Sequence, residues 1–170
     1  TALWDLTAAL GGEALALGGL AADAADGAAR IETALESGAA AEYFGRMVAA
    51  QGGPVDFVER WPDRLPAAPV QREVPCPGEG FVTAIDGFAL GQAVVHLGGG
   101  RLREGDKVNP SVGLSDLAGI GEEAHRDVPL GIVHAATEAE AMAAVQAVQA
   151  AYSLGAVAPA DPPLVHMRIA

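Results

Sequence analysis

The chain has 170 residues, of which 51% are hydrophobic and only 5% aromatic, so it can bury one ordinary core or two small ones. Its formal net charge of −12 repels phosphate backbones and anionic membranes, which excludes nucleic acid and anionic lipid as expected partners. The single cysteine, Cys76, excludes an internal disulfide framework and a site built on several thiolates, and it fits a reducing, cytoplasmic compartment.

The first part of the chain has the apolar spacing of three helices. Leucines recur at helical steps between Leu3 and Leu20, and no basic residue precedes Arg30, which argues against a signal peptide. Asp23 is expected to cap a second helix that ends at Gly38. A third helix carries an apolar face from Tyr43 to Val48, which we expect to pack into a core rather than to stack on a base.

A proline-rich connector is expected at residues 62–77, because five prolines disfavour a long helix there. Beyond it the pattern predicts short strands at 70–74, 80–85, 111–114 and 128–134, and a closing strand at 164–169. Asp86 is expected to cap a helix that stops at Gly98. Thr137 is expected to open a capping box for a helix that runs through Tyr152.

These elements predict an α+β fold in two parts. Residues 1–61 form a helical segment, and residues 78–170 form a mixed α+β domain after the connector. Because the chain begins inside a helical pattern, we expect it to be a piece of a longer protein. The first helix is then expected to expose an apolar patch around Leu6, Leu10 and Leu17. Its two glycine rows, Gly11 with Gly18 and Gly12 with Gly19, are expected to pack against elements of the longer protein. Weak self-association of the fragment follows from that patch.

Only one segment has a composition that suits a small anion. Gly98, Gly99 and Gly100 leave backbone amides unobstructed, and Arg101 and Arg103 follow directly. The segment follows the end of a helix, where the dipole is negative, so a plain helix stop is the favoured interpretation and phosphate binding the alternative. No histidine pattern predicts a metal site, and no motif predicts a catalytic residue.

A series of short stretches carries a resemblance that covers essentially the whole chain in order. They are Ala41–Gln51 (AEYFGRMVAAQ), Gly53–Phe57 (GPVDF), Gly78–Val82, Ala89–Gly91, Gly98–Arg101, Asp106–Val108 and Ser111–Leu114. Together they resemble the C-terminal portion of bacterial thymidine phosphorylases, which belong to the pyrimidine nucleoside phosphorylases.

The resemblance implies a homodimeric parent enzyme with a helical domain, a large α/β domain and a hammerhead-like C-terminal domain. The helices of residues 1–61 would belong to the large α/β domain. Phosphate, as co-substrate, attacks the anomeric carbon of thymidine or deoxyuridine, and the products are the base and 2-deoxyribose 1-phosphate; no cofactor is implied. The family's Lys-His-Ser-Thr-Gly-Gly phosphate loop and its base clamp of Arg, Ser and Lys do not occur in this sequence. We therefore expect no catalytic residue here, and we expect the fragment to be structural and inactive. A weak role of Arg101 or Arg103 in closing over substrate stays open.

Two alternatives come from other functional classes. The stretches Gly80–Val82, Gly105–Val108 and Val128–Val133 resemble biotinyl and lipoyl carrier domains, whose modified lysine stands at a hairpin tip. Lys107 is the only lysine in the chain, but its context is not that of a hairpin. A stand-alone interaction module is the other alternative.

Overall fold

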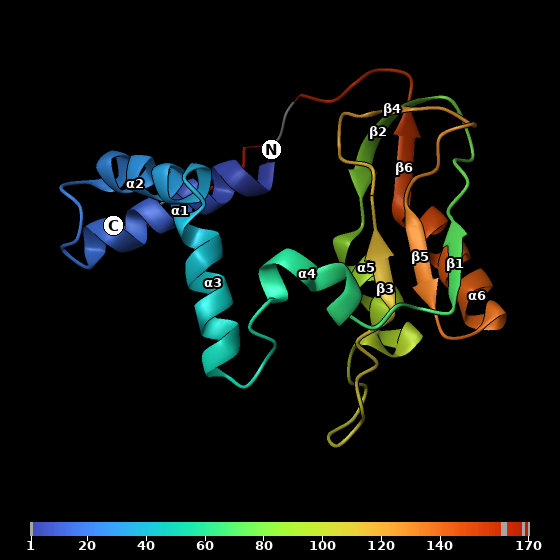
Figure 1. Ribbon diagram of the computed structural model, residues 1–170. Helices are drawn as coiled ribbons and strands as arrows, with labels where there is room; N and C mark the ends of the chain where they lie inside the picture. The colour runs from blue at the N-terminus through green and yellow to red at the C-terminus, as the bar shows by residue number, and fades with distance from the viewer. Residues whose placement is uncertain (1, 161–162, 168, 170) are drawn as a thin grey trace. The chain divides into compact units, whose positions relative to one another are not determined.

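The computed structural model describes residues 2–160, 163–167 and 169, and it shows a mixed α+β protein (Figure 1). The chain divides into two compact units. Unit 1 contains Thr1–Arg64 and Pro162–Ala170, and unit 2 contains Leu65–Asp161. The α+β class predicted from the sequence is confirmed. Among the described residues, no helix combines the length and the apolar run that crossing a bilayer requires.

Unit 1 is helical. Its elements are α1 (Ala2–Leu17), α2 (Ala24–Glu36), α3 (Ala39–Ala50) and α4 (Phe57–Arg64). The three expected helices are confirmed. Asp23 caps α2, since its carboxylate accepts a hydrogen bond from Asp26 N at 2.9 Å. Gly38, at a φ of 81°, lies between α2 and α3 in a conformation that suits glycine.

The fourth helix, α4, contains Pro62, although prolines disfavour helix interiors. The backbone leaves helical geometry at Arg60, where φ is −128°. Pro62 therefore lies in the first turn of the segment that follows, where a helix has no amide to bond. The predicted connector thus begins inside a short, kinked helix.

Two glycines let α1 and α2 meet backbone to backbone. A Cβ added to Gly12 would lie 2.5 Å from Ala24 O, and one added to Gly27 would lie 2.4 Å from Gly12 O. Gly11 likewise packs against the side chain of Ile31, at 2.9 Å from an added Cβ. The expectation that the glycine rows of α1 meet absent elements is therefore wrong for Gly11 and Gly12, which pack on α2 of the same chain.

The apolar face of α3 is exposed, so the expectation that it packs into a core is wrong. Tyr43 is 69% exposed and Phe44 is 47% exposed. The Phe44 ring meets Phe57 edge to face at 5.9 Å, and the Arg46 guanidinium lies 4.9 Å from the centre of the Tyr43 ring. Helical spacing predicts which residues share a face, but among the described residues Phe57 of α4 covers this face only in part.

Unit 2 is built from two small antiparallel sheets and two helices. Its elements are β1 (Val70–Glu73), β2 (Gly80–Ile85), α5 (Gly87–Val94), the π-helical turn η1 (Val95–Gly99), β3 (Gly113–Ser115), β4 (Glu123–Ala124), β5 (Ile132–Ala135), α6 (Glu138–Ala151) and β6 (Tyr152–Gly155). The strand orders are β1-β5-β3 and β4-β2-β6. The helix α6 packs against α5 and against strands of both sheets.

The core of unit 2 is made of small and branched aliphatic side chains. The largest fully buried ones are Leu130, Val74, Val82, Val133 and Val148. The apolar spacing of the sequence predicts Val82, Ile85, Leu90, Val94, Ile132 and Val133 in this packing, and Val82 and Val133 are fully buried there. Four other residues predicted for this packing, namely Ile85, Leu90, Val94 and Ile132, are partly buried.

The expected caps of unit 2 are present. The Asp86 side chain accepts from Ala89 N at 2.9 Å and caps α5. Thr137 accepts from Glu140 N at 3.3 Å, and its hydroxyl donates to the Glu140 carboxylate at 2.9 Å. The Glu140 carboxylate thus accepts from the Thr137 hydroxyl and not from the Thr137 backbone amide, which is where the second bond of the expected capping box would form.

The C-terminal end of α6 differs from the expectation. The helix ends at Ala151, and Tyr152 begins β6, which pairs with β2. The Tyr152 hydroxyl donates a hydrogen bond to Ala118 O at 2.9 Å. This bond and the pairing with β2 outweigh the helical spacing of the sequence at Tyr152. A closing strand at 164–169 is absent from the described residues of that segment, and β6 occupies the closing position instead.

Candidate functional site

The glycine–arginine loop, residues 98–109, begins where η1 ends. Gly98 has a φ of 91°, and its carbonyl accepts from Asn109 N at 2.8 Å, which closes the loop. A Cβ on Gly99 would lie 2.8 Å from Val94 Cγ1, and one on Gly100 would lie 2.6 Å from Val95 Cγ2. Two of the three glycines therefore serve close packing on the preceding helical turns.

The backbone amides that follow are bonded within the loop. Asp106 Oδ2 accepts from Leu102 N at 3.1 Å and from Arg103 N at 2.8 Å. A carboxylate of the chain thus occupies the position where an anion would meet these two amides. An anion at this loop would have to be held by side chains.

Three basic side chains gather in the loop. Arg101, Arg103 and Lys107 are exposed, and in the described part of the chain none of them forms an ion pair. They are three of the ten Lys and Arg residues of a chain with a net charge of −12. The same loop contains Glu104 and Asp106, so its three basic and two acidic residues give a net charge of +1 in an otherwise acidic chain, a weak attraction for a small anion.

Lys107 lies in an irregular segment between η1 and β3, and no paired strands flank it. A carrier domain presents its lysine at the tip of a β-hairpin. The geometry therefore argues against a biotinyl or lipoyl attachment site at Lys107.

A polar cluster that the sequence patterns did not single out joins β3 to β5. Ser115 Oγ lies 2.9 Å from His134 Nε2 and 2.9 Å from Asp116 Oδ2. Asp116 has a φ of 52° and, in the described chain, is the non-glycine residue with a positive φ. Aspartate tolerates this conformation better than most residues because its short side chain bonds locally.

The protons of this cluster can be assigned from its chemistry. An ionised carboxylate only accepts, so the Ser115 hydroxyl donates to Asp116. The contact with His134 must then be donated by Nε2–H. His134 is therefore a donor to Ser115 rather than a base that activates it, and the cluster lacks the arrangement of a nucleophilic site.

His125 is surrounded by carboxylates. Its Nδ1 lies 3.1 Å from Glu79 Oε2, and its Nε2 lies 3.5 Å from Glu123 Oε1. The hydrogen bond that His125 Nδ1–H donates to Glu79, aided by the charges of Glu123 and Asp127, raises the pKa of His125 above its usual value, although burial opposes the shift. Glu79 Oε1 also accepts from Arg126 N at 3.2 Å, so Glu79 ties the start of β2 to the segment after β4.

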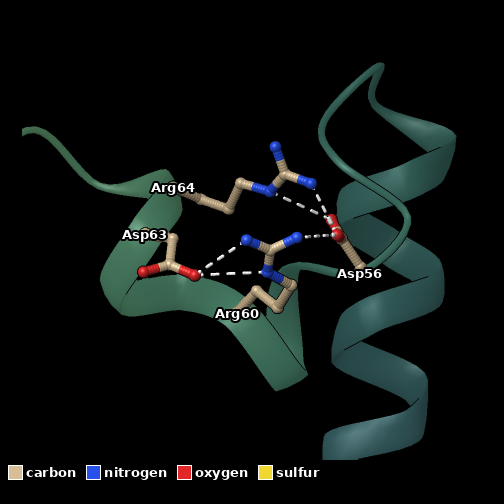
Figure 2. Close-up of polar contacts among 4 residues, drawn as sticks. All are labelled: Asp56, Arg60, Asp63 and Arg64. Atoms are coloured by element: carbon tan, nitrogen blue, oxygen red, sulfur yellow. Dashed lines mark hydrogen bonds and ion pairs between the residues drawn. The ribbon is translucent and has the colours of Figure 1, made fainter.

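An ion-pair network holds the two ends of α4 together (Figure 2). Arg64 donates to both carboxylate oxygens of Asp56, at 3.1 Å and 2.5 Å. Arg60 lies between Asp56 and Asp63, at 4.0 Å and 3.0 Å. The bond from Arg64 holds the pKa of Asp56 below its usual value and raises that of Arg64. The network contains no unpaired group that could receive a ligand.

The residues predicted for the site thus lie in one loop. Sequence reasoning missed the role of Asp106, whose carboxylate accepts hydrogen bonds from two backbone amides of that loop. It also missed the Ser115, Asp116 and His134 cluster, which only the pairing of β3 with β5 reveals. Across the described residues, no group of three or more His, Cys, Asp or Glu side chains is arranged to hold a metal ion.

Residues 81–155 match the family model described as the pyrimidine nucleoside phosphorylase C-terminal domain. The matched region lies within unit 2 and contains β2 to β6, α5, α6 and the glycine–arginine loop. It covers less than half of the chain. The match shows that this domain is similar to the C-terminal domain of pyrimidine nucleoside phosphorylases.

Proposed function

We propose that this chain serves a phosphorylase that converts thymidine and phosphate into thymine and 2-deoxyribose 1-phosphate. The observation that carries the proposal is the match of residues 81–155 to the C-terminal domain of pyrimidine nucleoside phosphorylases. The stretches Ala41–Gln51 and Gly53–Phe57 support the same family outside the matched region. They also point to thymidine as the substrate, by their resemblance to thymidine phosphorylases.

The chain's own role is structural in this proposal. Phosphorolysis needs a site for the phosphate nucleophile and donors that stabilise charge on the departing base. The sequence lacks the family's phosphate loop and base clamp. No cofactor is required, and phosphate is the co-substrate. The active protein is a cytoplasmic homodimer in which other residues supply the chemistry.

In this proposal the glycine–arginine loop is the part of the chain that influences catalysis. Arg101 and Arg103 are exposed cations. One substrate of the proposed reaction, phosphate, and one product, 2-deoxyribose 1-phosphate, are anionic. In this proposal the two side chains attract phosphate electrostatically toward its binding site, and they form no bond to the reacting atoms.

The experiment expresses the complete reading frame that contains this chain and measures phosphorolysis of thymidine, deoxyuridine and uridine. Preference for the two deoxynucleosides supports the proposal, and absence of phosphate-dependent turnover on all three refutes it. In the active protein, an Arg101→Ala/Arg103→Ala variant should lower kcat/KM roughly two- to tenfold by weakening attraction of phosphate. Arg126→Ala, which removes another exposed cation of unit 2, is the matched control and should leave kcat/KM unchanged.

A further inference from the structure

An apolar groove in unit 2 lies between α5 with η1 on one side and α6 on the other. The groove has a volume of about 560 Å³. Its lining residues recur every three or four positions on each helix, so they share one face of that helix. Phe88, Ala89 and Ala93 line it from α5, and Ala143, Ala144 and Ala147 line it from α6. The alanines leave space that larger side chains would fill, and the volume lies within the range of small-molecule sites.

Phe88 is the aromatic side chain of this lining. The Phe88 side chain is 78% exposed, so its ring is open to a ligand. An aromatic ring presents a negative face to whatever approaches it, and cations bind there favourably. The ring therefore adds a preference for positive charge to an otherwise apolar surface.

The polar groups of the lining accept rather than donate. His96 Nδ1 lies 2.7 Å from the carbonyl oxygen of Gln92, and a carbonyl only accepts, so Nδ1 carries the proton. In the neutral imidazole, Nε2 is then an acceptor. The Gln92 amide lines the groove as well, and because it can both donate and accept it adds no preference.

Glu140 is the anionic side chain of the groove lining. One of its oxygens, Oε2, accepts from the Thr137 hydroxyl at 2.9 Å. In the described structure, Oε1 has no hydrogen-bond partner and no cation pairs with the carboxylate. The lining thus contains one negative charge, one imidazole acceptor and no Lys or Arg.

From this complementarity we infer that the groove binds a small organic cation: an aromatic or aliphatic body with an ammonium head. The apolar body fills the space over the alanines beside Phe88. The ammonium donates to the Glu140 carboxylate and to His96 Nε2. The groove lining shares no residue with the glycine–arginine loop.

The test uses three probes of similar shape on the full chain: 2-phenylethylammonium, 2-phenylethanol and 3-phenylpropionate. Binding is followed by amide shifts in two-dimensional NMR. The ammonium should shift residues 88–97 and 140–147, and it should bind roughly two- to fivefold more tightly than the alcohol, as one exposed ion pair allows. The carboxylate should bind most weakly.

Variants locate the site. Ala147 is exposed, so Ala147→Leu fills the groove without disturbing the core and should weaken every probe roughly tenfold. Ala150→Leu, on the same helix but outside the groove, should leave affinity unchanged. Glu140→Gln should abolish the preference for ammonium over alcohol, whereas Glu138→Gln should preserve it. Glu140→Gln also changes the cap of α6, so a second variant that leaves the cap intact is needed. Gln92→Glu adds a carboxylate to the groove lining and should increase the preference for the ammonium over the alcohol.

Two results would overturn the inference. Equal binding of all three probes would show a purely apolar surface, such as one that a protein partner covers. Unchanged affinity in Ala147→Leu, in a variant whose spectrum shows a folded protein, would place the probes elsewhere.

Discussion

Ser115 and His134 meet diagonally across β3 and β5. Ser115 pairs with Ile132 across the ladder and His134 pairs with Gly113, so the two side chains share a face two residues apart, with Oγ and Nε2 at 2.9 Å. Asp116 accepts from the same hydroxyl at 2.9 Å. The chain of donors runs from His134 through Ser115 to Asp116, and it links the end of an edge strand to the middle strand of the sheet.

Ser115→Ala removes both bonds and should lower the free energy of unfolding by about 1–3 kcal/mol, since each such hydrogen bond contributes about 0.5–1.5 kcal/mol net. Ser115→Thr keeps the hydroxyl and should retain most of the stability. Ser153→Ala, at an exposed position of β6, is the control. Nitrogen NMR of His134 should show the proton on Nε2 in the parent chain, and a proton on Nδ1 alone would contradict the assigned donor.

The contact between Gly12 and Gly27 predicts a large effect of one methyl group. In Gly27→Ala the added Cβ meets a backbone oxygen at 2.4 Å, so α1 and α2 must separate. We expect a loss of about 1–3 kcal/mol, measured by chemical denaturation of unit 1.

Gly91→Ala in α5 is the matched control for that substitution. An added Cβ there meets nothing within 4 Å, so helix propensity alone should raise stability by up to about 1 kcal/mol. If both alanine variants had the same effect, the close approach of α1 and α2 would not be a determinant of stability.

The carboxylates around His125 predict a pH dependence. Since Glu79 and Glu123 raise the pKa of His125, the folded state favours the imidazolium more than the unfolded state does. The stabilising contribution is complete below the unfolded pKa of about 6.5 and is lost as the pH rises through the higher folded value. An NMR titration should show a pKa above 6.5.

Two variants separate this contribution from other titrations. His125→Gln should remove the change in denaturation midpoint over that window, while His166→Gln should not. A folded pKa of His125 at or below the unfolded value would contradict the role assigned to Glu79.

The exposed stripe of α1 predicts weak self-association of the 170-residue chain. Leu10 and Leu17 are 56% and 87% exposed, whereas Leu6 is partly buried, so the stripe is displaced from the patch expected from the sequence. Hiding apolar surface contributes about 25 cal/mol per Å², against which association entropy must be set. Sedimentation over a concentration series should show reversible dimerisation, and a Leu10→Gln/Leu17→Gln variant should be monomeric. Leu102→Gln, at an exposed position of unit 2, should behave as the parent chain.

Sequence reasoning succeeded where structure is decided locally. Asp23, Asp86 and Thr137 cap helices as expected, because a capping side chain bonds amides only three residues away. It failed where distant segments decide the outcome. Helical spacing continues through Tyr152, but pairing with β2 makes that residue a strand, and the exposure of Tyr43 depends on what covers α3.

The candidate site shows the same division. The glycine–arginine loop could be found from its composition, since three glycines and two arginines are adjacent. Its internal bonds to Asp106 could not, because they depend on how the loop closes at Asn109. The meeting of Ser115 with His134 depends on the register of β3 and β5, which no local pattern specifies.

The proposed function makes this chain part of a phosphorylase whose reacting groups are supplied by other residues. The most direct measurement follows phosphate-dependent release of 2-deoxyribose 1-phosphate from thymidine, for the 170-residue chain of verified mass and for the complete reading frame in parallel. The account predicts turnover by the complete protein and none above background by the chain alone. Turnover by the chain alone, lost when phosphate is omitted, would contradict it.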